Sequence, residues 1–376
     1  MRHAIHAAFA VAIGLSAGAQ ASGKPVDLAY RADQSSLRIP GAAANARLPL
    51  LLEELVPRPE PVPAAVPEPE APARKPMLDV WERVREGFAL PNLESPLVSQ
   101  WQAWYLNRPQ LLKALFERSR RYVYHVVEEL DKRGMPTELA FLPMVESGYN
   151  PMALSSVQAA GLWQFIPSTG KTHKLEQNQL YDERRDVIAS TSAALDYLQF
   201  LHEQFGDWHL ALASYNWGEN AVGRAIERNK AKGQPADYRM LVLPEETRNY
   251  IAKLQALKNI AANPRAFNLE LEPVPNRPYF ATVASARDIE INVAARLADV
   301  PLTEFLALNP AYSLPIISMN TRTQIVLPVE KLESFASNLE SYKKSLVGEE
   351  TAKRRTRSMP KLPITSKRRP ANALSR

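Results

Sequence analysis

The chain has 376 residues, 45% of them hydrophobic, with 31 prolines, 14 glycines and no cysteine. This length suffices for one large domain or two moderate ones, each with a proper core. A sequence without cysteine has no disulfides, thiolate nucleophiles, cysteine-ligated zinc or lipid attached through a cysteine. The formal net charge of +6 is modest, so its local distribution says more than its total.

Residues 1–21 have the pattern of a signal peptide. Arg2 precedes an apolar run over residues 7–15, and Ala19-Gln20-Ala21 has the small-x-small form of a cleavage site. The apolar run is too short to span a membrane. We expect cleavage after Ala21 and export to the periplasm in soluble form. Association of the exported protein with the cell wall is compatible with this expectation. The alternative, a buried N-terminal helix, has to accommodate Gly14 and Gly18.

Residues 22–77 are polar and rich in proline, most densely over residues 57–76. Such a composition favours an extended chain and cannot pack a core. We therefore expect a disordered linker here, with order beginning near Met77.

Residues 78–265 are expected to form an all-helical domain, with a catalytic core over about 131–262. Apolar residues recur there at spacings of three and four, and no strand pattern interrupts them. The clearest stripe ends at Gly206, and Asp207 is placed to cap the helix that follows. The members of that stripe are Ile188, Thr191, Leu195, Leu198, Leu201 and Phe205.

The remainder of the chain has a different character. A second proline-rich connector spans residues 269–278, and residues 279–330 predict a small strand–helix–helix–strand module. Residues 331–376 are expected to be a basic, disordered tail, because residues 351–376 contain Lys and Arg without a single acidic residue. The predicted fold class is mainly α, with a small α+β module after the helical domain.

The candidate for catalysis lies in residues 138–150, ELAFLPMVESGYN. Leu142 and Val145 belong to a buried helical stripe, and Glu146 falls on the same stripe. Gly148 predicts that the helix ends there, so the terminal carbonyls lie near Glu146. Burial and these carbonyls both raise the pKa of a carboxyl, as a general acid near neutral pH requires. The alternative is an interior Glu paired with an Arg.

Other kinds of chemistry have little support. The histidines outside the leader are His125, His173, His202 and His209, and none has metal-ligand spacing. Ser147 lacks a nucleophile-elbow sequence. Residues 168–172 look like part of a phosphate-binding loop, but Phe165 occupies the place of its first glycine. We expect no metal and no cofactor.

Several short motifs nevertheless recur in a characteristic order. These are Glu146-Ser147, then Gly161-Leu162-Trp163-Gln164, then Ser214-Tyr215-Asn216. In this order and spacing they resemble the family 1 lytic transglycosylases, which cut peptidoglycan on a lysozyme-like helical fold. The segments VEELDKRGMPTELAFLPMVES, AAGLWQFIPSTGK, YDERRDVIASTSAALDYL and LPEETRNYIAKLQAL are most similar to the branch of membrane-bound lytic murein transglycosylase D.

The resemblance implies a role for each matching residue. Glu146 matches the single catalytic acid/base, and Ser155 the serine that binds the substrate or the catalytic carboxyl. Gln164, Tyr215, Asn216 and Tyr250 match residues that line the saccharide groove. Residues 279–330 resemble a degenerate LysM repeat that lacks the usual early glycine. The chain also has Gln158 where the family often has glycine, and lacks the cysteine that this branch usually lipidates.

The implied reaction uses one carboxyl twice. Glu146 protonates the oxygen between N-acetylmuramic acid and N-acetylglucosamine, the substrate's N-acetyl oxygen supports the charge at C1, and Glu146 then deprotonates the C6 hydroxyl. The product is 1,6-anhydro-N-acetylmuramic acid, and no water is consumed. The resemblance implies peptidoglycan glycan strands as the partner. We expect no binding of nucleic acid, no lipid anchor and a monomeric protein. A muramidase-type hydrolase on the same fold and a non-catalytic wall-binding protein remain alternatives.

Overall fold

The computed structural model describes residues 77–284, 288–318 and 324–357, with side chains described as far as residue 345. The expected leader (1–21), the linker (22–77) except its last residue, and the end of the basic tail lie outside the described residues. All described residues belong to one compact unit.

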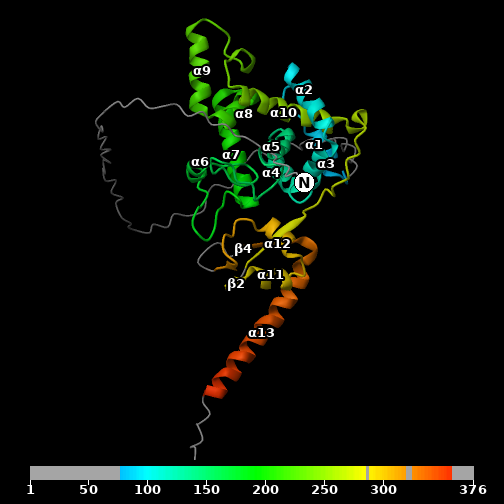
Figure 1. Ribbon diagram of the computed structural model, residues 1–376, viewed down its shortest axis with the longest axis vertical. Helices are drawn as coiled ribbons and strands as arrows, with labels where there is room; N and C mark the ends of the chain where they lie inside the picture. Colours follow the sequence, from blue (N-terminus) through cyan, green and yellow to red (C-terminus); the bar gives the residue numbers. More distant parts are fainter. Residues whose placement is uncertain (1–76, 285–287, 319–323, 358–376) are drawn as a thin grey trace, which may run out of the picture. The chain divides into compact units, whose positions relative to one another are not determined.

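Helices make up the first part of the described chain (Figure 1), which confirms the mainly α fold class. The α-helices are α1 (Val80–Glu86), α2 (Pro96–Leu106), α3 (Pro109–Ser119), α4 (Val123–Lys132), α5 (Leu142–Glu146), α6 (Pro167–Thr172), α7 (Val187–Phe205), α8 (Trp208–Trp217), α9 (Glu219–Ala231) and α10 (Glu245–Ala262). Short 3₁₀ turns are η1 (Thr137–Phe141), η2 (Tyr238–Met240) and η3 (Pro264–Phe267).

Helix α7 shows why the sequence folds in this way. The Asp186 side chain caps it by accepting hydrogen bonds from the amides of Ile188 and Ala189. Gly206 ends it in the left-handed conformation with φ +68°. Between these ends, Leu195, Leu198 and Leu201 are fully buried. This helix follows the stripe that the sequence predicts.

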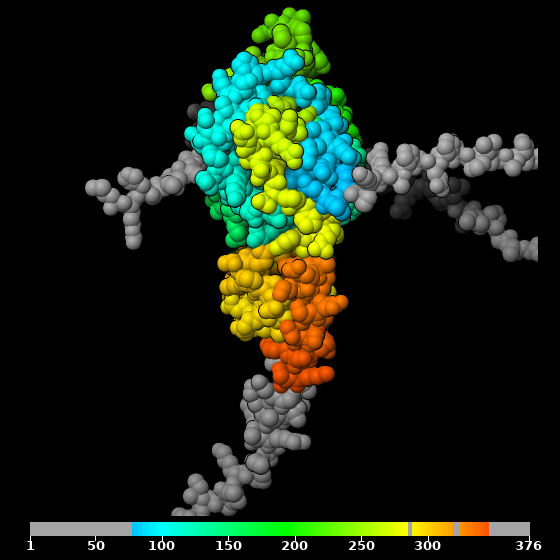
Figure 2. Space-filling model, turned by 90° about the vertical axis from the view of Figure 1, so that its right-hand side faces the viewer, coloured from blue at the N-terminus to red at the C-terminus, as the bar shows by residue number. Residues whose placement is uncertain are grey.

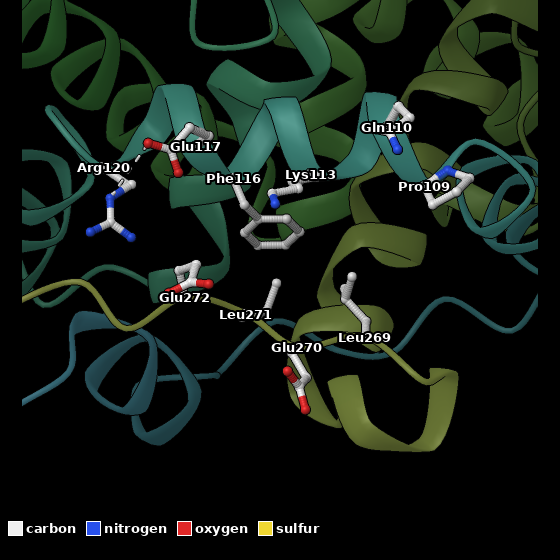
Figure 3. Close-up of a pocket in the computed structure, with 10 residues that line it drawn as sticks. All are labelled: Pro109, Gln110, Lys113, Phe116, Glu117, Arg120, Leu269, Glu270, Leu271 and Glu272. Atoms are coloured by element: carbon white, nitrogen blue, oxygen red, sulfur yellow. Dashed lines mark ion pairs between the residues drawn. The ribbon is translucent and has the colours of Figure 1, made fainter.

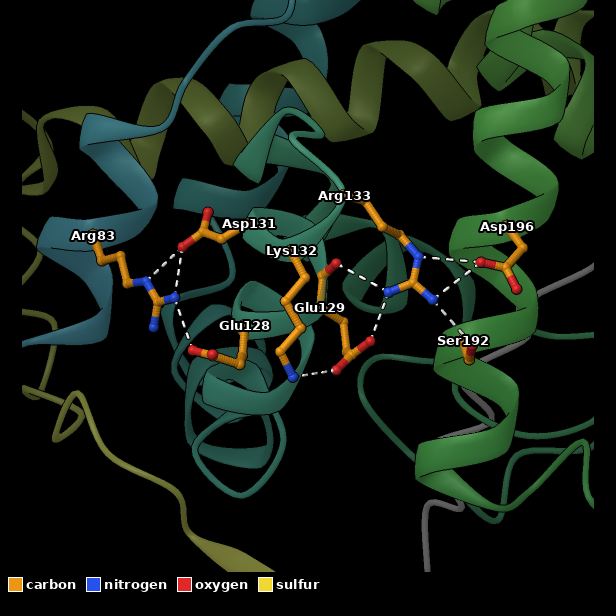
Figure 4. A network of polar contacts seen from close by, with 8 residues as sticks. All are labelled: Arg83, Glu128, Glu129, Asp131, Lys132, Arg133, Ser192 and Asp196. Carbon is orange, nitrogen blue, oxygen red and sulfur yellow. Dashed lines mark hydrogen bonds and ion pairs between the residues drawn. The ribbon is translucent and has the colours of Figure 1, made fainter. Parts of the chain in front are cut away.

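Ion pairs join α1, α4 and α7 on one surface (Figure 4). Arg83 of α1 contacts Glu128 at 2.9 Å and Asp131 at 2.6 Å, both on α4. Arg133, just after α4, contacts Glu129 at 2.6 Å and Asp196 of α7 at 3.0 Å. Such half-exposed pairs orient the helices more than they stabilise them.

The connector after η3 is part of the packed structure. The amide of Val80 donates to Val274 O at 2.8 Å, and the amide of Asn276 donates to Leu78 O at 2.9 Å. In Figure 2 this yellow segment lies across the face made by the blue and cyan helices. The connector therefore pairs with the start of the helical domain over residues 78–80.

The C-terminal module, residues 279–330, contains β1 (Phe280–Ala284), β2 (Ile289–Glu290), α11 (Ile291–Leu297), α12 (Leu302–Leu308), β3 (Ile316–Ile317), β4 (Gln324–Pro328) and η4 (Val329–Lys331). Strands β1 and β4 pair antiparallel, with Phe280 opposite Pro328. The order strand–helix–helix–strand agrees with the prediction. The short antiparallel pair of β2 and β3 was too brief to predict.

The prediction of a disordered tail from residue 331 is wrong for residues 332–357. These form helix α13 (Leu332–Arg357). Phe335 is buried in the core of the C-terminal module, and Leu332 and Leu339 pack against that core. The spacing of these residues puts them on one face of a helix, so burial orders a segment whose composition suggested a tail.

The C-terminal module contacts the helical domain at two places. Near α4, Arg121 pairs with Glu304 at 2.6 Å, and the Tyr122 hydroxyl donates to Ala307 O at 2.9 Å. Near α7, the amide of Asp182 donates to Ala311 O at 2.9 Å. Within the part of the chain that the structure describes, no helix combines the length and apolar character needed to cross a bilayer.

One buried ion pair anchors the helical domain. Glu138 is fully buried and contacts Lys258 of α10 at 2.9 Å. Its two oxygens also accept the amides of Ala89 and Leu90, each at 2.9 Å. The carboxylate therefore fastens the chain after α1 to both η1 and α10.

Replacing Lys258 with Met should lower the free energy of unfolding by about 3–5 kcal/mol, because Glu138 then stays buried without its cation. The measurement is denaturant unfolding at neutral pH. Lys230→Met is the matched control, because its pair with Glu227 is 61% and 71% exposed and should contribute less than about 1 kcal/mol. Equal losses in both variants would contradict the anchoring role of Glu138.

Candidate active site

Glu146 is the last residue of α5, as the sequence predicts. The preceding turn is 3₁₀ rather than α, because Pro143 at the start of α5 has no amide hydrogen to continue a helix from η1. The amide of Ser147 donates to Pro143 O at 3.1 Å, and the Tyr149 hydroxyl donates to Ala140 O at 2.8 Å. These bonds fix the chain on both sides of Glu146.

The Glu146 carboxyl is surrounded by protein atoms while the residue keeps an opening to solvent. The pKa of Glu146 is raised to about 7, mainly by burial and in smaller part by the negative charge of Glu246. The hydrogen bond from the Tyr250 hydroxyl to Oε1, at 2.5 Å, and the charge of Lys253 oppose this rise. A carboxyl of this kind carries a proton in a substantial fraction of molecules at neutral pH.

Helix α10 supplies the groups that surround Glu146. Glu246, Tyr250 and Lys253 lie four and three residues apart, so they share one face of the helix. Burial first, and then the charge of Glu146, raises the pKa of Tyr250 well above its usual value. Tyr250 therefore keeps its proton and remains a donor to the carboxyl.

Helix α2 adds an aromatic side chain next to this face. The Lys253 ammonium lies over the Trp101 ring at 4.5 Å from its centroid. Trp101 Nε1 donates to Asn249 Oδ1 at 2.8 Å. Trp101 and Lys253 were not predicted from the sequence. The helical spacing of Lys253 from Tyr250 would have pointed to Lys253, whereas nothing local identifies Trp101.

Gln164 belongs to the loop that runs beside α5. The side-chain Nε2 of Gln164 donates to Gly161 O at 2.8 Å, and the Gln164 backbone has φ +50°. Ser147 Oγ donates to Leu162 O in the same loop at 2.9 Å. This loop therefore contacts the residue that follows Glu146.

Tyr215 and Asn216 come from the end of α8. The Tyr215 hydroxyl donates to Trp163 O at 2.9 Å, and the charge of Glu146, after burial, raises the pKa of Tyr215. Asn216 Oδ1 accepts from Thr247 Oγ1 at 2.8 Å. Trp163 itself is buried, with Nε1 bonded to Thr191 Oγ1 at 3.0 Å, so it is a core residue.

Ser155 lies in a turn of its own. Its Oγ accepts the amide of Ala159 at 3.0 Å, and its amide donates to Ala159 O at 2.9 Å. The Glu146 carboxyl accepts its hydrogen bond from Tyr250. The structure therefore brings Tyr250 to Glu146, gathers Gln164 and Tyr215 along the adjoining loop, and shows Ser155 stabilising its own turn.

A separate hollow of about 260 Å³ lies between α3 and the connector (Figure 3). Phe116 and Leu271 form its apolar part, and Lys113, Glu117 and Arg120 bring charges to its rim. It contains none of the site residues predicted from the sequence. In the described ranges, no group of three or more His, Asp or Glu side chains is arranged to hold a metal ion.

Comparison with known proteins gives a family for each part of the chain. Residues 125–237 match the model of the transglycosylase SLT domain. Residues 279–344 match the LysM-like domain of lytic transglycosylase MltD.

Individual relatives cover different shares of the chain. It is 33% identical over 264 residues to membrane-bound lytic murein transglycosylase D of Escherichia coli K12, covering 70% of this chain and 58% of that protein. It is 44% identical over 124 residues to a putative tributyltin chloride resistance protein of Alteromonas sp. M-1, covering 33% and 60%. A putative soluble lytic murein transglycosylase of Haemophilus influenzae is 34% identical over 137 residues, covering 33% and 23%.

The chain thus spans less than two thirds of the length of these relatives. The two domain matches follow each other in the order of the helical domain and the C-terminal module. The chain therefore contains a transglycosylase SLT domain at residues 125–237, followed by a LysM-like domain of the lytic transglycosylase MltD type at residues 279–344.

Proposed function

We propose that this protein is a peptidoglycan lytic transglycosylase that cleaves the β-1,4 bond between N-acetylmuramic acid and N-acetylglucosamine. The observation that carries the proposal is Glu146. It ends α5 beside α10, accepts a hydrogen bond from Tyr250, and has its pKa raised to about 7 by burial. A carboxyl with this pKa is suited both to give and to take a proton near neutral pH.

In the proposed reaction Glu146 first acts as an acid and protonates the glycosidic oxygen. The N-acetyl oxygen of the substrate supports the positive charge that develops at C1. Glu146, now ionised, accepts the proton of the C6 hydroxyl as that oxygen bonds to C1. The released glycan ends in 1,6-anhydro-N-acetylmuramic acid, and the enzyme returns to its starting protonation state.

Tyr250 has a defined part in this sequence. As a donor to Oε1 it stabilises the ionised form that exists between the two steps, and its own raised pKa keeps the proton on the phenol. Burial works in the opposite direction and favours the protonated form that begins the reaction. These two opposing effects hold the carboxyl close to the balance that an acid and then a base needs.

A muramidase-type hydrolase requires a second carboxylate as nucleophile or base. The candidate in the described chain is Glu246, whose charge acts on Glu146. Burial raises the pKa of Glu246 itself, which disfavours the ionised form that a nucleophile or base must have at the start of the reaction, and we therefore favour the single-carboxyl reaction. We further propose that the protein works in the periplasm, from the pattern of residues 1–21.

Glu146→Gln should reduce the rate of release of anhydromuropeptides from purified sacculi by about 10⁴-fold or more. General acid/base assistance is worth about 10²–10⁴, and here one group serves both steps. The measurement is mass spectrometry of the released products, with glycan binding followed in parallel. Glu117→Gln, with a carboxylate 62% exposed, is the control and should release products at the wild-type rate. Near wild-type release by Glu146→Gln would remove Glu146 from the mechanism.

The pH dependence should follow the pKa of Glu146. Because the first step needs the protonated carboxyl, kcat/KM should fall tenfold per pH unit above about pH 7. The folded pKa lies above the ordinary value of 4.5, so the unfolding free energy of wild type, relative to Glu146→Gln, should decrease as the pH rises through this interval. A pH-independent difference in stability, measured by denaturant unfolding at pH 4 and pH 8, would contradict the raised pKa.

Glu246→Gln separates the two mechanisms. It removes a charge that raises the pKa of Glu146, so the alkaline limb of the pH–rate profile should move to lower pH while the rate at pH 6 changes less than about tenfold. Loss of activity comparable to that of Glu146→Gln, at every pH, would show that a second carboxylate takes part in the chemistry.

A further inference from the structure

The segment between α6 and α7 contains a buried guanidinium that binds the loop beside Glu146. Arg184 is 7% exposed. Its Nη1 donates to Gln158 O at 2.6 Å and to Phe165 O at 3.1 Å. These two carbonyls stand near the two ends of the loop, residues 158–165. The guanidinium thus holds both ends of the loop at fixed positions.

The backbone on either side fits this contact closely. A side chain at Gly161, which has φ +84°, would place its Cβ 1.9 Å from Arg184 O. The loop and the Arg184 backbone therefore pack directly against each other. Gln158 also has a positive φ, +63°, which a non-glycine residue adopts only when its surroundings impose it. The bond from Arg184 to its carbonyl is one such constraint.

The loop passes this constraint to the candidate active site. Leu162 O accepts from Ser147 Oγ at 2.9 Å, next to Glu146, and Trp163 O accepts from the Tyr215 hydroxyl at 2.9 Å. Gln164 lies in the same stretch and bonds to Gly161 O at 2.8 Å. A shift of this loop would therefore move the residue after Glu146 and the ring of Tyr215 together.

On its other side, Arg184 is held by Asp182. The Asp182 carboxylate accepts from Arg184 Nε at 3.0 Å and from Nη2 at 2.8 Å. The amide of Asp182 donates to Ala311 O of the C-terminal module at 2.9 Å, and the Ser313 amide donates to Leu180 O at 2.9 Å. Residues 180–182 thus pair with residues 311–313 as a short antiparallel bridge.

Aromatic packing reinforces the bridge. Tyr181 is 3% exposed and belongs to the apolar core of the C-terminal module, where its ring lies 4.9 Å from that of Tyr312. The Tyr181 hydroxyl also bonds to the carboxylate of Asp186, the residue that caps α7. A side chain of the helical domain therefore completes the core of the module.

We propose that Arg184 is a positioning residue for the reaction, because it fixes the loop at residues 158–165. The C-terminal module holds this loop in place through its contacts with residues 180–184, in addition to any contact with the cell wall. The proposal rests on the proposed transglycosylase function. The module then contributes to turnover even on short soluble glycans that are too small to reach it as a separate binding site.

The first test is Arg184→Ala in the full-length protein, assayed on short soluble glycans. We expect kcat to fall about 10- to 100-fold with KM changed less than about threefold, since small displacements of reacting groups cost rate rather than affinity. Guanidinium added at millimolar concentration should raise the kcat of Arg184→Ala at least fivefold, whereas methylammonium should not. Arg121→Ala, which loses an ion pair with the module at a place away from residues 180–184, is the matched control and should keep the wild-type kcat.

Hydrogen exchange supplies a readout that does not depend on activity. The amides of Ala160 and Gly161 are bonded within this region, to Phe165 O and Ala153 O, and should exchange faster in Arg184→Ala, while the amides of α10 should not. Tyr312→Ala, which removes the ring packed on Tyr181, should produce the same local change and a smaller loss of kcat. Arg184→Lys serves as a milder variant, with an intermediate loss of kcat, where Arg184→Ala fails to fold.

Each outcome decides one part of the proposal. Wild-type kcat and wild-type exchange in a folded Arg184 variant would overturn the positioning role. Unchanged exchange at residues 160–161 in Tyr312→Ala would overturn the brace. If the wild-type protein itself released no anhydro product, the proposed function would fail, and the exchange measurements would still decide whether Arg184 and the module hold the loop.

Discussion

The burial of one carboxyl at the end of a short helix is the constraint on which the site depends. Removing Glu146 from water disfavours its charge, and the resulting pKa of about 7 is useful only if the ionised form is also tolerated. Tyr250 provides that tolerance through a hydrogen bond, and Lys253 through its charge. The long helix α10 carries both groups, so the position of α10 against α5 sets the electrostatics of the candidate active site.

The packing around α10 shows how this position is maintained. The ion pair of Lys258 with the fully buried Glu138 joins α10 to the turn that leads into α5. A few residues away along the same helix, Tyr250 contacts Glu146. A helix fixed by a buried charge pair at one point can hold a hydrogen bond at another without much freedom. Stability and catalysis therefore share one element of the fold.

The sequence was sufficient to predict the helical domain and the place of Glu146. The stripe around Leu142 and the stop signal at Gly148 are local patterns, and local patterns can be read from the sequence without knowledge of the fold. Trp101 and Lys253 could not be predicted in the same way, because their pairing joins helices α2 and α10, far apart in the chain. The contact of Arg184 with the loop at Gly161 is also long-range. The composition of residues 331–376 led to the wrong prediction of a disordered tail, because the burial of Phe335 depends on the core of the neighbouring module.

Isotope labelling of the product shows whether C1 is attacked by the C6 hydroxyl, as the reaction with a single carboxyl requires, or by water. Purified sacculi are digested with the wild-type protein in water enriched in oxygen-18, and the released glycans are weighed by mass spectrometry. The single-carboxyl reaction should give muramic acid ends that are lighter by one water than hydrolysis products and carry no oxygen-18. Reducing ends that contain oxygen-18 would contradict it, because water rather than the C6 hydroxyl would then have attacked C1.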